Sequence, residues 1–333
     1  MIVSRTPFRV TLGGGGTDLP SYSDRHGGFV FAMAIDQGVN VSVHAPEFDE
    51  KIRFQHTETE VVDHPSELEH DLTREALKRR GIESRLVVSS TADLPGGVGL
   101  GSSGSYTVGL LAALRAHQGQ PYPPEELAEE AFDLEANTLG KGVGRQDPYM
   151  VAFGGLSVIE TRCDGATTVR RAEIDPSTLD DFVRNTRLYW TGVRRSASEV
   201  LSDQDRAMKT VRAADHAVVQ DSLHRIKELG MASLASMETG DFDRFGQLMD
   251  EHWQHKKRLS RRVTIPGIDE LYADIKARFG VLGGKVSGAG GGGFFCVYVP
   301  RAHDELDAFM ASAGLERMAY GIAPRGAEIV FGA

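Results

Sequence analysis

The chain has 333 residues, and its 47 acidic side chains outnumber its 37 Lys and Arg residues, which gives a formal net charge of −10. The length is sufficient for two domains of ordinary size, and a content of 41% hydrophobic and 25% charged residues is typical of a globular protein. The acidic balance argues against a general nucleic-acid binder, and the sequence has no stretch of about 18 apolar residues that would predict a membrane span.

The cysteines and the first residues bear on the compartment. Cys163 and Cys296 have neither a metal-like nor a C-x-x-C spacing, so we expect two buried thiols in a reducing environment. The chain reaches the polar stretch 5–9 without an apolar signal region before it. We therefore expect a cytoplasmic protein.

The first predicted element is a strand at 9–12, which is followed by four glycines at 13–16 and then by Thr17 and Asp18. A hairpin turn usually needs only one or two glycines. One interpretation is a loose turn in which Asp18 caps a helix. The other is a close approach of the backbone to a ligand, with Asp18 accepting hydrogen bonds from hydroxyl groups of that ligand.

The next segments alternate between strand and helix patterns. We expect strands at 30–43 and 51–62, a helix at 64–81, and a buried strand at 84–90 that leads toward a second glycine-rich segment.

That second segment, 94–105, has five glycines in twelve residues and precedes an apolar helix. A glycine-rich loop that feeds a helix N-terminus is typical of an anion site, because free amides and the positive end of the helix dipole coincide there. Of three interpretations of this segment, a flexible connector is the least favoured, because so many glycines would be a large entropic cost for a connector. Residues 99–104 also match the dinucleotide pattern G-x-G-x-x-G, but the expected acidic residue at the end of a second strand is missing. The third interpretation is an ATP loop without the Gly-Lys-Ser/Thr of a P-loop.

Pro95 followed by Gly99-Leu100-Gly101-Ser102-Ser103 resembles the signature of the GHMP kinases, the family of galactokinase, homoserine kinase, mevalonate kinase and phosphomevalonate kinase. The resemblance extends over nearly the whole chain. It implies an α+β, two-domain fold, with an N-terminal half (1–180) like ribosomal protein S5 domain 2 and a ferredoxin-like C-terminal half (181–333). It also implies that ATP is bound by Pro95, Gly96, Gly97, Gly99, Leu100, Gly101, Ser102 and Ser103.

A carboxylate lies on the apolar stripe of the helix predicted at 125–139. Glu135 is spaced from Ala128, Phe132 and Leu139 at helical intervals, so it must be paired, protonated or metal-bound. A buried salt bridge and a metal site are equally compatible with this spacing. The family resemblance implies that Glu135 binds Mg²⁺ together with Ser103, and oxygen ligands of this kind suit that ion.

The segment 140–155 contains Asp147 directly before a proline, where an aspartate often starts a turn. The resemblance instead places the catalytic aspartate of the family at Asp147, as the group that takes the proton of a sugar hydroxyl. It places a cation at Arg9, where mevalonate-kinase-type members have lysine. Arginine is a permanent cation, so Arg9 can stabilise charge but cannot exchange a proton.

The second half begins after a region of short strands and turns at 156–184. We expect a strand at 187–192, helices to about 279, a helix at 304–313, and closing strands at 318–322 and 327–331. A third glycine loop at 283–293 lies between strand-like flanks, which argues against a linker. The basic run within 251–262 is either a solvated helix face or a grip for a substrate phosphate.

Within the family, the chain is most similar to the kinases of D-glycero-D-manno-heptose 7-phosphate, which phosphorylate the anomeric hydroxyl. Fucokinase-type enzymes share much of the pattern, and a non-catalytic sugar- or nucleotide-binding relative is a further alternative. The resemblance rests on residues 6–10, 14–20, 189–192, 195–198 and 252–257.

The resemblance implies a small-molecule sugar phosphate as substrate, and charge alone suggests which basic residues hold its phosphate. Its expected contacts are Gly14, Gly15, Gly16, Thr17, Asp18, Gly288, Gly290, Gly291, Arg194, Arg195, Lys256 and Lys257. ATP and Mg²⁺ are the expected cofactors. The oligomeric state is left open, with a homodimer as one option.

Overall fold

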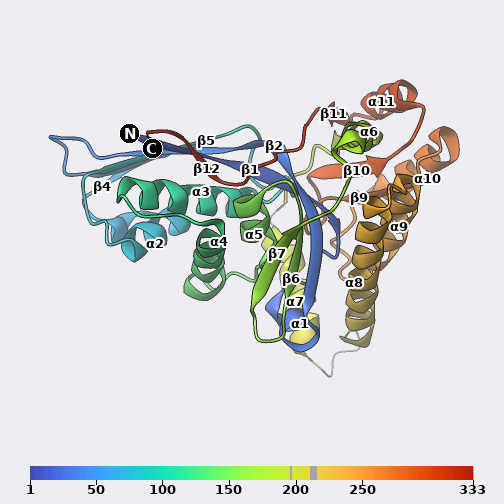
Figure 1. Ribbon diagram of the computed structural model, residues 1–333, viewed down its shortest axis with the longest axis horizontal. Coiled ribbons are helices and arrows are strands. Elements are labelled where there is room, and N and C mark those ends of the chain that lie inside the picture. Colours follow the sequence, from blue (N-terminus) through green and yellow to red (C-terminus); the bar gives the residue numbers. More distant parts are fainter. Residues whose placement is uncertain (196, 211–215, 333) are drawn as a thin grey trace.

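The computed structural model describes residues 1–195, 197–210 and 216–332. It contains two β-sheets of eight and four strands, each covered by helices, so the expected α+β class is confirmed (Figure 1). Of the described residues, none belongs to a helix that is both long and apolar enough to cross a membrane.

The first sheet is built around two long antiparallel strands, β1 (Ile2–Gly13) and β2 (Gly28–His44). The first eight residues of β2 are all buried, which is why this stretch is a continuous apolar run. A register shift next to Phe8 separates the two ends of β2: its first part pairs with β6 (Leu156–Thr161) and its last part with β5 (Leu86–Ala92). The sheet is completed by β3 (Ile52–Gln55), β4 (Thr59–Val62), β7 (Thr167–Arg171) and β12 (Glu328–Phe331).

Helices cover one face of this sheet (Figure 1). The central one is α3 (Ser102–His117), in which every residue from Gly104 to Leu114 is buried. A side chain at Gly109 would come within 2.7 Å of Thr6 Oγ1, so this glycine lets the helix approach β1 closely. The other N-terminal helices are α1 (Pro20–His26), α2 (Asp71–Arg79), α4 (Pro124–Asp133) and α5 (Gln146–Phe153).

The second sheet is antiparallel and has the strand order β11-β8-β10-β9. Its strands are β8 (Thr186–Trp190), β9 (Gly283–Val286), β10 (Phe294–Tyr298) and β11 (Glu316–Met318). One helical crossover after β8 and a second after β10 produce this order, which is that of a ferredoxin-like unit. The accompanying helices are α6 (Leu179–Asn185), α7 (Ala197–Lys209), α8 (His216–Glu238), α9 (Phe242–Lys256), α10 (Ile268–Phe279) and α11 (His303–Ser312).

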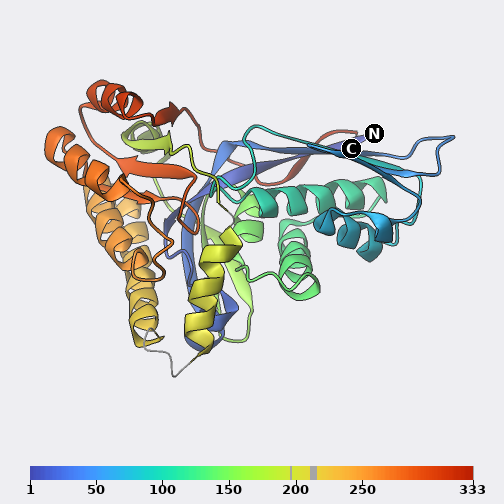
Figure 2. The ribbon, with the colours of Figure 1, turned by 180° about the vertical axis from the view of Figure 1, so that it is seen from behind.

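From behind, α7 lies between the first sheet with its helices and the orange helices of the second domain (Figure 2). It contacts both α1 and α8. The fold therefore places the segment after β8 at the junction of the two domains, beside the site described below.

Several local expectations are corrected. Residues 283–286 form β9, so the third glycine loop begins only at Ser287. The helix expected at 125–139 is α4 followed by a π-helical turn, Leu134–Thr138. Cys163 is exposed in the turn after β6, because the apolar sequence ends there, whereas Cys296 is buried as expected.

The last residues also depart from the expected division of the chain. Ile322 forms a bridge to Ile35, and β12 pairs with β1, so the segment after β11 returns to the first sheet instead of closing the second. The chain ends consequently lie side by side (Figure 1). The domain boundary at residue 180 remains a prediction, but the last residues of the second half belong to the sheet of the first half.

Candidate active site

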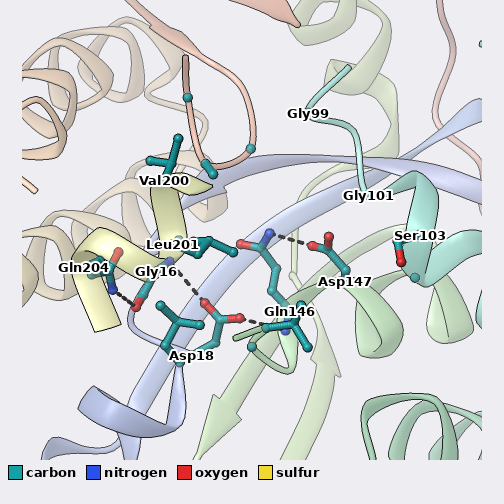
Figure 3. Close-up of a pocket in the computed structure, with 18 of the residues that line it drawn as sticks. Gly16, Asp18, Gly99, Gly101, Ser103, Gln146, Asp147, Val200, Leu201 and Gln204 are labelled. Atoms are coloured by element: carbon teal, nitrogen blue, oxygen red, sulfur yellow. Dashed lines mark hydrogen bonds between the residues drawn. The ribbon is translucent and has the colours of Figure 1, made fainter. Parts of the chain in front are cut away.

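A pocket of about 380 Å³ lies where both domains meet. Its walls come from the turn after β1, the loop before α3, the segment around α5, helix α7, the end of α9 and the loop between β9 and β10. Figure 3 shows Asp18, Gln146, Asp147 and Ser103 arranged along one side of it, with α7 residues opposite. The three glycine-rich segments of the sequence therefore meet at one site.

The loop before α3 supplies free amides at the helix N-terminus. Gly97, Gly99 and Gly101 have φ values of 79°, 77° and 79°, which favour glycine strongly over other residues. The backbone N–H of Arg9 donates to Leu100 O at 3.0 Å and ties this loop to β1. A helix N-terminus preceded by glycines in this conformation is suited to an anion, and ATP binding at this loop stays a prediction.

Gly101 and one further glycine, Gly104, let the loop approach the acidic side of the pocket. A Cβ at Gly101 would lie 3.1 Å from Arg9 Cγ, and one at Gly104 would lie 2.9 Å from Asp147 Cβ. Larger residues at these positions would push Arg9 and Asp147 away from the start of α3. The glycine pattern thus accommodates Arg9 and Asp147 as well as the turn of the loop.

Asp147 and Arg9 form a close ion pair at the pocket floor. Arg9 Nε and Nη2 lie 2.8 and 2.7 Å from Asp147 Oδ1, and Gln146 Nε2 donates to the same oxygen at 2.9 Å. Arg9 is 4% exposed, whereas Asp147 is half-buried and lines the pocket. Because these contacts all reach Oδ1, Oδ2 is left to accept a hydrogen bond from a hydroxyl group.

Glu135 and Ser103 lie together at the start of α3, as expected. Ser103 Oγ donates to Glu135 Oε2 at 2.7 Å, and Thr107 Oγ1 donates to Oε1 at 3.2 Å. Glu135 is 4% exposed, and burial raises the pKa of its carboxyl, with Asp147 adding to the rise and Ser103 opposing it. A carboxylate and a hydroxyl oxygen beside an anion loop form a donor set that fits Mg²⁺.

Asp18 caps a helix, as one interpretation of the sequence had it, but the helix is α5 and not the adjacent α1. Its Oδ1 accepts a hydrogen bond from the backbone N–H of Gly16 at 3.1 Å, and its Oδ2 accepts one from that of Gln146, the first residue of α5, at 2.9 Å. The carboxylate therefore receives an amide from the first turn of α5 and fixes the residue before Asp147. Asp18 still lines the pocket, but burial raises its pKa.

The third glycine loop contacts the second. A Cβ at Gly288 would lie 2.6 Å from Gly99 O, and one at Gly293 would lie 2.1 Å from Val98 O. Arg9 Nη1 donates to Gly99 O at 2.7 Å from the other side. The two loops and the Arg9–Asp147 ion pair are thus in direct contact across the domain junction.

The four predicted basic residues separate into two groups. Arg195 and Lys256 line the pocket, whereas Arg194 is exposed outside it and Lys257 pairs with Asp269 at 2.9 Å. Other predicted residues also lie outside the pocket wall: Gly14 and Thr17 pack against Phe29 O of β2, and Leu100 is fully buried. Pro95, Gly96 and Gly291 are likewise not among the lining residues. Ser196 and the side chains of Ala197 and Ser198 lie outside the described part of the chain.

Two glutamines of the site were not predicted. Gln146 orients Asp147, and Gln204 of α7 donates to Gly16 O at 2.8 Å, which closes the pocket against the first glycine run. Gln146 had a signal, because it precedes the predicted aspartate in the motif. Gln204 had none, since it is 188 positions from its partner.

Comparison with known proteins agrees with this geometry. The model of the GHMP kinase N-terminal domain matches residues 69–155, and that of the C-terminal domain matches residues 233–312, together half of the chain. The chain therefore belongs to the GHMP kinase family.

The individual relatives have low sequence identity to this chain. A D-glycero-alpha-D-manno-heptose 7-phosphate kinase from Campylobacter jejuni is 28% identical, over 90% of this chain and 89% of its own length. An L-fucokinase/L-fucose-1-P guanylyltransferase from Bacteroides fragilis is 25% identical over 88% of this chain but only 34% of its own. The crystal structure of a D-glycero-D-manno-heptose 1-phosphate kinase from Bacteroides thetaiotaomicron superimposes with a TM-score of 0.80 over both entire chains at 21% identity, which shows the shared fold.

Proposed function

We propose that the protein transfers the γ-phosphoryl group of ATP to the anomeric hydroxyl of D-glycero-D-manno-heptose 7-phosphate, which yields the 1,7-bisphosphate and ADP. The observation that carries the proposal is the Asp147–Arg9 pair, which lies against a glycine loop at a helix N-terminus. The Campylobacter jejuni relative supports the choice of sugar, since it matches nearly the full length of the chain.

The chemistry follows from the residues of the pair. Oδ2 of Asp147 orients the anomeric hydroxyl and accepts its proton as the oxygen forms a bond to the γ-phosphorus, while the bond to the bridging β,γ-oxygen breaks. Arg9 balances the negative charge that develops during the transfer, and it holds the Asp147 carboxylate through Oδ1. Phosphoryl transfer depends mainly on positioning and on charge neutralisation, so these groups are sufficient protein machinery.

The phosphates of ATP lie over residues 97–103 in this proposal, where the free amides at the start of α3 receive them. Ser103 and Glu135 would hold Mg²⁺, which when bound neutralises charge on the phosphate oxygens. The sugar lies against Gly15, Gly16 and Asp18. Of the four cations predicted for a substrate phosphate, Arg195 and Lys256 remain as candidates, because both line the pocket.

A substrate panel tests the proposal. Purified protein is incubated with Mg·ATP and with D-glycero-D-manno-heptose 7-phosphate, the free heptose or L-fucose. ADP release is followed by a coupled assay, and the product is assigned by phosphorus NMR. We expect the highest kcat/KM for the heptose 7-phosphate and a new phosphate at the anomeric carbon. Equal rates with and without the 7-phosphate would overturn the substrate assignment.

A fucokinase activity is the second candidate, because the Bacteroides fragilis relative also matches most of this chain. The same panel separates the two activities, since L-fucose carries no phosphate. If the protein bound nucleotide and sugar without releasing ADP, it would instead be a regulator. A regulator is expected to have lost Asp147 or Glu135, and this chain has both.

A further inference from the structure

One buried cation at the pocket, so far considered only as a contact of the substrate's own phosphate, has no part in the transfer step described above. Lys256, the last residue of α9, is 7% exposed and lines the pocket beside Gly288, Ala289 and Gly290. Its Nζ donates to Val286 O at 2.7 Å and to Gly288 O at 2.6 Å. An ammonium group has three N–H donors, so one remains for a ligand in the pocket.

The contacts of Lys256 place it beside the reacting groups. Gly288, whose carbonyl it binds, packs directly against Gly99, and Gly99 O accepts the hydrogen bond from Arg9 Nη1. The ammonium is thus joined through two glycines to the Arg9–Asp147 pair. This position is at the meeting point of the two glycine loops, where the proposed function places the end of the ATP phosphates.

The charges around Lys256 call for an anion. In the described part of the chain no carboxylate pairs with its ammonium, and the buried ammonium of Lys285 and guanidinium of Arg9 lie near it. Burial is the main reason why the pKa of Lys256 is held well below its usual value, and the charges of Lys285 and Arg9 lower it further. The buried thiol of Cys296 acts in the opposite direction. His252 is another buried titratable neighbour of Lys256. A buried cation without a counter-ion is costly, and a phosphate group would remove that cost.

We propose that Lys256 is a catalytic residue that binds the transferring phosphoryl group of ATP with its remaining N–H. This inference rests on the proposed phosphoryl transfer and changes the role of Lys256 from a contact of the substrate's own phosphate to a contact of the reacting one. Lys256 then acts with Arg9 from the opposite domain, so the cationic environment of the γ-phosphate is complete only when both glycine loops are in contact.

Steady-state kinetics of Lys256→Met, a neutral residue of similar length, tests the assignment. With each sugar that the wild-type protein phosphorylates, we expect kcat to fall about 10²–10³-fold, as for other single donors to a developing charge. The KM for the sugar should change little, whether or not the sugar is phosphorylated. A rise in KM confined to the phosphorylated sugar would show that Lys256 binds the substrate's phosphate and would overturn the proposal, as would an unchanged kcat.

Lys256→Arg tests whether the site requires a cation with N–H donors at this position, because arginine restores both. We expect it to recover part of the lost kcat. Lys276→Met, which removes an ammonium paired with Asp250 outside the pocket, serves as the control for loss of one charge in the same domain. Circular dichroism and thermal melting verify that the variants are folded.

Nucleotide binding alone gives an independent readout. Phosphate beside Lys256 should raise the pKa of its ammonium, so the binding of Mg·AMPPNP should take up protons, measured by titration calorimetry in buffers of different ionisation enthalpy. We expect this uptake to disappear in Lys256→Met and Lys256→Arg. Unchanged uptake in both variants would count against the proposal. Since no sugar is present, a failure of the substrate panel would not be mistaken for a failure of this inference.

Discussion

At the scale of single residues, the carboxylate of Asp147 is held through one of its two oxygens, Oδ1. Arg9 and Gln146 both donate to Oδ1 of Asp147, so the carboxylate is oriented before a substrate arrives. The motif around 140–155 and the family resemblance predicted Asp147 and Arg9 individually. Their contact joins positions 138 residues apart, and no local pattern in one sequence specifies such a contact.

Replacing Asp147 by Asn tests its role as the proton acceptor. The amide keeps the size of the side chain and an oxygen for Arg9, but it cannot take a proton. We expect kcat to fall by about 10²–10⁴-fold with a melting temperature near that of the wild type. A coupled ADP assay and thermal melting measure both. Normal turnover by a folded Asp147→Asn protein would refute the assignment.

We expect Glu135 to lower the stability of the ligand-free protein and to be necessary for binding Mg·ATP. Because burial raises its pKa in the folded state, the ionised carboxyl destabilises the protein at neutral pH. Without metal and nucleotide, Glu135→Gln should therefore melt at an equal or higher temperature at pH 7, and the difference should vanish as the pH falls below 4.5, where the carboxyl is protonated in both the folded and the unfolded state.

The same Glu135→Gln variant should bind Mg·ATP at least about tenfold more weakly, since it loses an anionic oxygen ligand. Activity measured against Mg²⁺ concentration at fixed ATP tests this. If the metal dependence of the variant matched that of the wild type, the metal would be held elsewhere.

At the scale of elements, the sequence predicted whether a segment is a helix or a strand better than it predicted where that element begins and ends. Glycine flanked by apolar runs indicated strands on both sides of the third loop, yet Gly283 and Gly284 belong to β9 because a neighbouring strand supplies their hydrogen bonds. Helical spacing predicted a buried Glu135, and it is buried, although the helix ends in a π-turn. Such differences depend on tertiary contacts, which override local propensity.

The loop before α5 offers a matched pair of glycines. A Cβ at Gly144 would lie 2.0 Å from Asp18 Oδ2, whereas one at Gly142 would meet nothing within 4 Å, and neither residue has a positive φ. Gly144→Ala should displace Asp18, release the N-terminus of α5 and so misplace Asp147. We expect kcat to fall at least about tenfold and the melting temperature to drop, with Gly142→Ala close to the wild type in both. Equal effects of the two substitutions would contradict this role of Asp18.

At the scale of the whole molecule, the order of strands in the second sheet could be predicted, but the contact between the domains could not. The chain order strand, helices, two strands, helix and strand suits one ferredoxin-like arrangement, and the structure has it. The return of β12 to the first sheet is set by pairing with β1, and the closing pattern of the sequence alone did not distinguish the two sheets. Long-range pairing of this kind is not encoded in local periodicity.

A buried lysine links the two sheets and makes this contact measurable. Lys285 of β9 is 2% exposed, and its Nζ donates to Leu12 O of β1 at 2.9 Å. Burial lowers its pKa from 10.5 to about 8, with Arg9 adding to the fall and Cys296 opposing it. The unfolded chain therefore binds more protons than the folded one between pH 8 and 10.5, so this lysine makes the folded state gain stability as the pH rises through that range.

The two pKa values of Lys285 differ by about 2.5, which corresponds to about 3 kcal/mol at most. We expect the free energy of unfolding of the wild type, relative to Lys285→Met, to increase by up to that amount between pH 7.5 and 10.5. Urea unfolding at a series of pH values measures it, and Lys78→Met, at an exposed position beside Glu75, provides the comparison for loss of a surface ammonium. A constant difference between wild type and Lys285→Met would mean that this ammonium is not buried between the sheets. The expected result would show that the domain junction beneath the active site holds a cation at a cost in stability.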